Sequence, residues 1–287
     1  MSQISSPAWP VRLLQFVRFS HTIFALPFAL GSMLVAANGL PSWRLILLIL
    51  AAMVTARTAA MAFNRVADWE IDKRNPRTAG RHRLVSRSAA ISLIVISSLL
   101  FIVVCWWINA LCFALSPVAL GIVFFYSFTK RVTRFTQLFL GLALSVSPVG
   151  AWLAVTGAFA APPMWLAAAV LVWVAGFDLI YATQDVEIDR REGLRSMVTW
   201  LGVPRALVVA RVFHLLALAG LAIFGWSASL GMPYWLAVLG ILAALIYEHH
   251  QAARNDDLGT INRAFFNSNA VVGLLFVLGT GGSVLFG

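Results

Sequence analysis

The feature that most constrains this chain is a series of apolar runs, each long enough to cross a bilayer as a helix. A transmembrane helix needs about 20 apolar residues to cross about 30 Å of hydrocarbon, and such runs recur along the whole sequence. We predict an all-α polytopic membrane protein with nine transmembrane helices. The predicted spans are 20–38, 42–63, 88–108, 110–127, 136–156, 163–183, 204–226, 232–250 and 265–286.

Composition excludes the other broad classes of protein. Only 11% of the residues are charged, whereas an ordinary soluble protein has about a quarter, and the 61% hydrophobic content excludes a disordered chain. A β-barrel would show alternating segments of about ten residues instead of continuous runs. Cys105 and Cys112 lie inside apolar runs and form no CxxC pair. We therefore predict that they are small core residues with no metal or redox role.

The basic residues predict the orientation of the spans. Nearly all of the 21 Lys and Arg residues lie in connections on one side of the membrane, whereas Arg44 lies on the other side and Arg57 lies within a span. Because cytoplasmic loops retain positive charge, we predict a cytoplasmic N-terminus in a multi-pass protein of the inner (cytoplasmic) membrane. The net charge of +10 is therefore a topology signal and indicates no nucleic-acid partner.

The whole chain, 1–287, is predicted to form a single transmembrane domain. Residues 8–19 precede the first span and carry Arg12 and Arg18 among apolar residues, a pattern typical of a helix that lies in the membrane interface. This segment lacks the basic start and the small-residue cleavage site of a removable signal peptide. We therefore expect one interfacial helix followed by the nine spans.

Most of the 11 acidic residues gather in two clusters that share one pattern. Residues 68–72 read DWEID and residues 185–189 read DVEID, each at the end of a predicted span and each followed by two basic residues. Residues four apart lie on the same face of a helix, so the two aspartates of each copy converge, while Glu70 and Glu187 point away from that face. The converging residues are Asn64, Asp68 and Asp72 in the first segment (64–72) and Tyr181, Asp185 and Asp189 in the second segment (181–189).

Paired carboxylates repel each other unless a cation lies between them. Mg²⁺ is the natural candidate, because it takes oxygen ligands and prefers one or two carboxylates together with water and substrate phosphate. Two such sites facing each other would hold a diphosphate between metal ions, with Arg65, Lys130 and Arg131 as further charge partners for its oxygens. The alternative is solvated loop charges, which the repetition of the pattern in a chain nearly free of acids disfavours. The predicted metal ligands are Asn64, Asp68, Asp72, Asp185 and Asp189.

At these residues the sequence resembles the UbiA superfamily of intramembrane aromatic prenyltransferases, over essentially its full length. The family motif N-x-x-x-D-x-x-x-D is met at 64–72, and the motif Y-x-x-x-D-x-x-x-D at 181–189. Residues 126–131, YSFTKR, are similar to the family's Y-[PS]-x-x-K-R connection, and Arg57 matches an arginine of the quinone-pathway members. The resemblance implies nine helices around a central cavity, Mg²⁺ bound through both aspartate motifs, and transfer of a polyprenyl chain to a hydroxylated aromatic carboxylate. The implied partners are polyprenyl diphosphate, an aromatic acceptor and the lipid bilayer.

The resemblance points to two different aromatic acceptors. Typical 4-hydroxybenzoate members carry R-x-D-K/R-P-x-G near the first span, and here Arg18 is kept while the rest is replaced. Residues 21–29, 75–81 and 181–185 instead resemble the subgroup associated with menaquinone synthesis through futalosine, whose acceptor is a dihydroxynaphthoate. Both acceptors therefore stay open, in ubiquinone or menaquinone biosynthesis.

Three ionisable residues outside the motifs are further site candidates. Arg57 lies within a span, where a cation is expensive and usually functional; we predict that it anchors the acceptor carboxylate or the diphosphate, with a structural ion pair as the alternative. Asp178 shares a face with Asp185 and is a candidate partner of Arg57 or orients the acceptor. His21 is a candidate proton acceptor, or else a hydrogen-bonded packing residue. The predicted catalytic residues are Asp68, Asp72, Asp185, Asp189 and Arg57, and the predicted substrate-binding residues are Asn64, Arg65, Lys130, Arg131, Tyr181, Arg18, His21 and Asp178.

A secondary transporter or Mg²⁺ permease is the alternative from another class, since paired acids and intramembrane charge also suit ion pathways. Against it, both acid clusters lie on the same predicted side, and no matching polar set on the opposite side completes a path. Within the enzyme class, related chemistry on haem, chlorophyllide or glyceryl-phosphate acceptors is the alternative.

Overall fold

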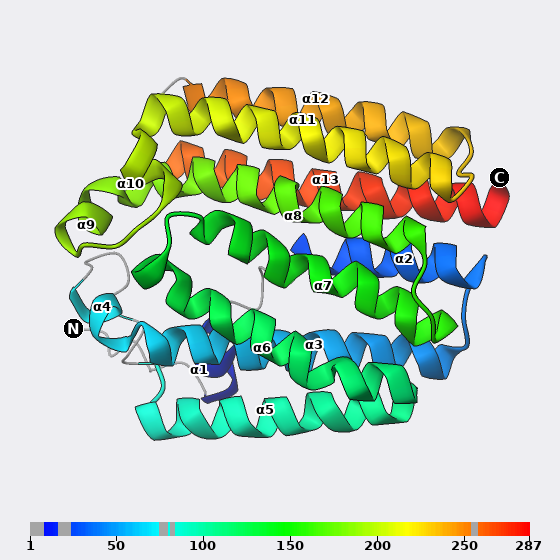
Figure 1. Ribbon diagram of the computed structural model, residues 1–287, viewed down its shortest axis with the longest axis horizontal. Helices are drawn as coiled ribbons and strands as arrows, with labels where there is room; N and C mark the ends of the chain where they lie inside the picture. The colour runs from blue at the N-terminus through cyan, green and yellow to red at the C-terminus, as the bar shows by residue number, and fades with distance from the viewer. Residues whose placement is uncertain (1–8, 17–23, 75–79, 81–83, 254–257) are drawn as a thin grey trace, which may run out of the picture.

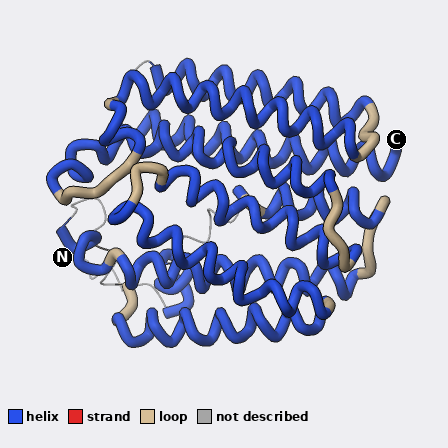
Figure 2. Tube along the Cα trace, in the orientation of Figure 1, coloured by secondary structure: helices blue, strands red, loops and turns tan. Residues whose placement is uncertain are grey.

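The computed structural model describes residues 9–16, 24–74, 80, 84–253 and 258–287. Within these ranges the chain forms helices and loops and no strand. Long helices run side by side in a bundle (Figure 1), and the described loops, tan in Figure 2, are short. The long helices are α2 (Leu26–Ala37), α3 (Trp43–Ala67), α5 (Arg87–Ile108), α6 (Ala110–Val132), α7 (Thr136–Thr156), α8 (Ala161–Ala182), α11 (Val203–Ser227), α12 (Met232–Ala253) and α13 (Leu258–Phe286). The short ones are α1 (Trp9–Phe16), α4 (Trp69–Arg74), η3 (Thr183–Asp185), α9 (Val186–Arg191) and α10 (Met197–Leu201).

Each predicted span overlaps one of the long helices. Among the described residues, eight helices are long and apolar enough to cross a membrane, and α2 is a shorter apolar helix. α2 has Pro27 in its first turn and ends before Asn38, whose left-handed backbone (φ 46°) closes the helix. The predicted all-α polytopic fold is therefore confirmed.

α8 is the most enclosed of the spans. It packs between α7 and α11, and 61% of its apolar window is buried within the protein, against 17% for α3. Small residues let the helices come close: a Cβ on Gly220 of α11 would lie 2.9 Å from the Cβ of Ala169. Phe28 joins α2 to this core, with its ring 4.9 Å from that of Trp173 and 4.7 Å from that of Phe276. The second aspartate segment thus follows the most deeply buried of the long helices.

The crossing of α7 and α8 depends on a glycine. A Cβ on Gly141 of α7 would overlap the backbone oxygen of Leu171 on α8. Gly141→Ala is therefore expected to push the two helices apart and to lower the free energy of unfolding by about 1–3 kcal/mol, measured as a lower thermal midpoint in detergent. Gly121→Ala on α6 is the matched control, because nothing lies within 4 Å of a Cβ there. Equal midpoints for the two variants would contradict this close crossing.

The other half of the bundle is built from α3, α5, α6 and α7. Its buried residues include Phe101 and Cys105 on α5 and Cys112 on α6. Both cysteines are buried and unbonded, in agreement with the prediction of core residues. Asn109 joins α5 to α6: its side chain accepts a hydrogen bond from Cys112 N, which caps α6, and donates one of 2.8 Å to the carbonyl of Leu153 on α7.

Candidate active site

The first aspartate segment continues α3 beyond its end. α3, α6 and α8 all finish at one end of the bundle, which we call the motif end (left in Figure 1). Asp68 ends α3, and α4 follows directly. Backbone hydrogen bonds from Asp68 N to Asn64 O (2.9 Å) and from Asp72 N to Asp68 O (2.7 Å) keep the four-residue spacing across the junction. The helical spacing on which the prediction rests is therefore present.

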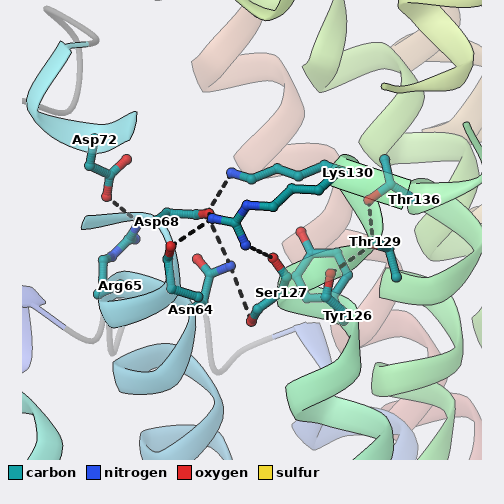
Figure 3. Close-up of polar contacts among 11 residues, drawn as sticks. Asn64, Arg65, Asp68, Asp72, Tyr126, Ser127, Thr129, Lys130 and Thr136 are labelled. Carbon is teal, nitrogen blue, oxygen red and sulfur yellow. Dashed lines mark hydrogen bonds and ion pairs between the residues drawn. The ribbon is translucent and has the colours of Figure 1, made fainter. Parts of the chain in front are cut away.

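Asp68 is held by two cations from α6. Its side chain is only 6% exposed; Lys130 Nζ lies 2.5 Å from Oδ2, and Arg131 Nη2 lies 3.1 Å from Oδ1. Asn64 Nδ2 donates to the same carboxylate at 3.4 Å. Figure 3 shows Lys130 reaching from α6 to Asp68 at the end of α3. Because burial reduces solvent screening, these pairs hold α6 against the first segment more firmly than exposed pairs would.

Arg65 fastens the neighbouring helices to α3. Its side chain is 7% exposed, and Nη1 lies 3.5 Å from Asp72 Oδ2 on α4. Its Nε donates to the carbonyl of Phe16 on α1, also at 3.5 Å. The structure thus places Arg65 beside the first segment, while its contact with a substrate stays a prediction.

The second aspartate segment continues α8 as the first continues α3. Tyr181 lies in the last turn of α8, Asp185 ends the turn η3, and Asp189 lies in α9. A long helix, a break and a short helix therefore follow one another in both segments. Asp178 lies within electrostatic range of Asp185 and Asp189 at this end of α8.

The two aspartate segments meet at the motif end. Arg74, the last residue of α4, pairs with Glu192 just beyond α9 at 3.1 Å. Tyr126 of α6 lies within electrostatic range of Asp68 from the first half and of Asp178 from the second. The end of α6 is therefore a bridge between the segments.

Both segments border one cavity. Its volume is about 730 Å³, and it lies within α3, α5, α6, α7 and α8. Asn64 of the first segment and Tyr181 of the second both line it. Its wall continues away from the motif end to Cys105 and Cys112, near the junction of α5 and α6. The four motif aspartates are not among its described lining residues; they follow Asn64 and Tyr181 in the chain at the motif end. The predicted hollow shared by the two segments is therefore present.

Arg57 is a cation within this cavity. It lies on α3 ahead of Asn64 and lines the cavity wall, as does Asp178 on α8. Its buried Nε has no hydrogen-bond partner among the described residues. Within the same residues Arg57 forms no ion pair with Asp178, its candidate partner. A cation among apolar groups is costly, and the ligand-binding role of Arg57 stays a prediction.

Two predicted site residues lie outside the described residues, and two residues that were not predicted lie beside the site. Arg18 and His21 lie outside the described residues, so their roles stay predictions. Sequence reasoning missed Tyr126, which lines the cavity, and Ser127, whose Oγ accepts a hydrogen bond from Asn64 Nδ2 at 3.4 Å. Both begin the YSFTKR stretch, whose similarity to the family's connection is the signal that could have found them.

The oxygen donors of the two segments suit a metal ion that is coordinated by the protein and the substrate together. In the part of the chain that the structure describes, no group of three or more His, Cys, Asp or Glu side chains is placed to hold a metal ion. In the sequence the motif aspartates instead form two pairs, one in each segment. Mg²⁺ keeps several waters and takes substrate phosphate oxygens beside one or two carboxylates. The residues present therefore fit Mg²⁺ bound together with a diphosphate.

Comparisons of sequence and of structure agree. The sequence profile of the UbiA prenyltransferase family matches residues 25–271. The 4-hydroxybenzoate octaprenyltransferase of Shewanella woodyi is 30% identical, over 93% of this chain and 94% of its own. An apo structure of a UbiA homolog from Aeropyrum pernix K1 has a TM-score of 0.82 and 31% identity, covering 91% of this chain and 96% of that chain. A UbiA homolog from Archaeoglobus fulgidus bound to GPP and Mg²⁺ shares the fold at 19% identity, with a TM-score of 0.75 over 96% of this chain and 99% of that chain. Because these matches cover most of the chain, it belongs to the UbiA prenyltransferase family, and it is a prenyltransferase.

Proposed function

We propose that this prenyltransferase moves a polyprenyl chain from polyprenyl diphosphate to a hydroxylated aromatic carboxylate, of the 4-hydroxybenzoate or dihydroxynaphthoate type, in quinone biosynthesis. The observation that carries the proposal is the cavity bordered by both aspartate segments, with an apolar body and Arg57 in its wall. Such a cavity suits one substrate with an apolar chain and a phosphate head and another with a carboxylate. The family assignment makes the transporter alternative wrong.

The aspartate segments are proposed to hold the diphosphate through Mg²⁺. The GPP and Mg²⁺ bound to the relative from Archaeoglobus fulgidus support this assignment. When bound, Mg²⁺ neutralises charge that develops on the diphosphate oxygens as the allylic C–O bond breaks. The proposed ligands are Asn64, Asp68, Asp72, Asp185 and Asp189.

Lys130 and Arg131 are proposed to stabilise the leaving diphosphate. Both cations already lie within 3.1 Å of Asp68 at the motif end. Cations fixed where negative charge develops stabilise a transition state without the cost of reorganisation. Arg65, through its contact with Asp72, is a further candidate partner for the diphosphate.

The acceptor is proposed to lie between Arg57 and the end of α8. A guanidinium binds a carboxylate through two parallel hydrogen bonds, and Asp178 and Tyr181 line the same cavity within reach of the acceptor hydroxyl in this proposal. The ring forms a C–C bond to the allylic carbon and loses a proton, and the diphosphate departs with the electrons of the broken C–O bond. The apolar wall excludes water, which would otherwise capture the allylic cation. Arg18 and His21 stay candidates for substrate contacts.

Arg57→Ala is expected to raise the KM for the acceptor selectively. A hydrogen bond to a charged group contributes about 1.5–3 kcal/mol, so the rise should be about 10- to 100-fold, with little change in the KM for the donor. The measurement is steady-state transfer from radiolabelled polyprenyl diphosphate to 4-hydroxybenzoate and to dihydroxynaphthoate, using purified protein in detergent. The more efficient acceptor of the wild-type protein identifies the pathway.

Arg44→Ala is the matched control for this measurement, because Arg44 lies on the same helix but is exposed near its beginning. Its KM values should equal those of the wild type. If Arg57→Ala instead loses folded protein while the remaining enzyme keeps its acceptor KM, the role of Arg57 is structural. If the wild type prenylates neither aromatic acid, the proposed acceptor class is wrong.

We also propose that the motif end faces the cytoplasm and that residues 1–287 form one domain with α1 as an interfacial helix. Retention of positive charge on the cytoplasmic side supports this orientation, since Lys73, Lys130 and Arg190 lie at the motif end and Arg44 lies at the other. Phe16 of α1 is buried in one cluster with residues of α3 and α5, which fastens α1 to the bundle.

A further inference from the structure

A buried histidine contacts α8 on the side that faces away from the cavity. His214 of α11 is 2% exposed, and the other buried residues of this helix are small or apolar. α11 packs along α8 and lies between α8 and α12 (Figure 1). A polar ring in such a seam is costly unless its nitrogens are hydrogen-bonded. The two nitrogens of His214 therefore need partners on the neighbouring helices.

The imidazole of His214 bonds to the backbone of α8. Its Nε2 lies 3.3 Å from the carbonyl oxygen of Trp173. Gly176 makes room for the ring, because a Cβ there would lie 2.4 Å from its Cδ2 atom. Neither Trp173 nor Gly176 is a described lining residue of the cavity, whereas Asp178 and Tyr181 of the same helix line it. His214 thus supports α8 from the side opposite to its cavity residues.

His249 of α12 is the second partner of His214. Its Nε2 lies 2.9 Å from His214 Nδ1, and the two rings pack edge to face with their centroids 4.9 Å apart. The preceding residue, Glu248, accepts a hydrogen bond of 3.2 Å from Asn269 Nδ2 on α13. Two consecutive residues of α12 therefore bond to two different helices. The end of α12 that carries His249 is fastened to α13 and to α11.

The carbonyl group of Trp173 determines which ring nitrogens carry hydrogen. A carbonyl oxygen only accepts hydrogen bonds, so His214 Nε2 donates to it. A charged ring is costly in this apolar seam, so His214 is neutral and has a single N–H. Its Nδ1 therefore accepts a hydrogen bond from His249 Nε2. His249 thus fixes the tautomer and the orientation of His214, and His214 bonds to α8.

The supported stretch of α8 leads directly to the cavity. The ring of Trp173 packs edge to face on that of Phe177 at 5.0 Å, and Phe177 packs on Phe24 at 5.7 Å. Phe24 and Phe177 line the cavity, together with Asp178 and Tyr181. A displacement of the backbone at Trp173 therefore moves the cavity residues that follow one and two turns later. Small displacements of groups that orient a substrate cost a large part of the rate.

We propose that His214 and His249 are positioning residues of the transferase, which hold α8 so that Asp178 and Tyr181 face the aromatic acceptor. Neither histidine is a described lining residue of the cavity, so both act through the backbone of α8. This inference rests on the proposed function, because it takes the end of α8 as one wall of the acceptor site.

The test removes the two hydrogen bonds and then restores one of them. His249→Leu removes the donor to His214, and His214→Phe keeps an aromatic ring against Gly176 without either hydrogen bond. His249→Gln restores an N–H donor, and His250→Leu is the matched control, because His250 is the next residue and is exposed. Steady-state transfer to the aromatic acid that the wild type prenylates, and thermal unfolding, are measured for each purified protein in detergent.

We expect kcat/KM for the acceptor to fall about 3- to 10-fold in His249→Leu and in His214→Phe, which corresponds to the loss of a hydrogen bond between neutral groups. The KM for the donor should stay within about twofold of the wild type, because the ion pairs of Asp68 with α6 are not disturbed. His249→Gln should recover most of the loss, and His250→Leu should equal the wild type. The double variant should lose no more than His214→Phe alone, because both residues act through one contact with α8.

A purely structural pair gives a different result. Lower thermal midpoints with unchanged kinetic constants of the remaining folded enzyme overturn the positioning role, and so does an equal rise of the KM for donor and acceptor. Failure of His249→Gln to recover the loss overturns the role of the hydrogen bond. A wild-type protein that prenylates neither aromatic acid contradicts the proposed function itself, and this result is distinguishable because it appears before any substitution.

Discussion

Asp68→Asn and Asp185→Asn are each expected to lower kcat by about 10²- to 10³-fold or more, because each removes a negative charge from the groups proposed to hold the metal and the diphosphate. Asp68→Asn also leaves Lys130 and Arg131 beside a neutral amide, which destabilises the motif end. Thermal unfolding in detergent must therefore accompany the activity measurement. Asp185→Asn is included as a second variant because it leaves the pairs of Lys130 and Arg131 with Asp68 intact.

Glu70→Gln and Glu187→Gln are the matched controls for these aspartates. Both glutamates belong to the same two segments; Glu70 is 65% exposed in its pair with Lys73, and Glu187 is exposed. Each substitution removes the same charge and is expected to leave kcat within about twofold of the wild type, since exposed ion pairs contribute little. Near-normal activity of both aspartate variants would remove the case for metal binding by the two segments.

Removal of divalent cations with EDTA is expected to abolish transfer, with a loss of at least about 10²-fold, and added Mg²⁺ should restore it. Mg²⁺ prefers one or two carboxylates together with water and substrate phosphate, so we expect the diphosphate to supply part of its coordination. Binding of the metal and binding of the donor are then linked, and each tightens the other by the same factor. A Mg²⁺ titration at two concentrations of donor measures this linkage.

Two results would contradict this prediction. Full activity in excess EDTA would exclude an essential, exchangeable divalent cation. An apparent Mg²⁺ affinity that does not change with the donor concentration would show that the protein holds the ion without the diphosphate. Ca²⁺ in place of Mg²⁺ is the control for general screening of charge, since Ca²⁺ prefers more oxygen ligands at longer distances.

The properties that follow from local sequence were predictable. Hydrophobic length locates a span without knowledge of its neighbours, and the prediction for 88–108 differs by one residue from α5, Arg87–Ile108. The spacing of Asn64, Asp68 and Asp72 likewise needs only helical geometry, which the backbone hydrogen bonds keep across the end of α3. The grouping of both segments at one end followed from counting spans.

The partners of these residues were not predictable in the same way. Lys130 was expected to face a diphosphate, and the structure places it on Asp68. The pair of Arg74 with Glu192 and the hydrogen bond from Asn64 to Ser127 also join distant parts of the chain. Periodicity gives the face on which a residue lies but not the helix that this face meets.

The unequal enclosure of α3 and α8 decides which wall can be redesigned. α8 is packed on most of its circumference, so a library of substitutions along it would mainly select for restored packing. α3 is buried over 17% of its apolar window, yet it carries Arg57 and Asn64 on its cavity side. Changes of acceptor preference are therefore best sought on α3, where new side chains have room and the scaffold tolerates them.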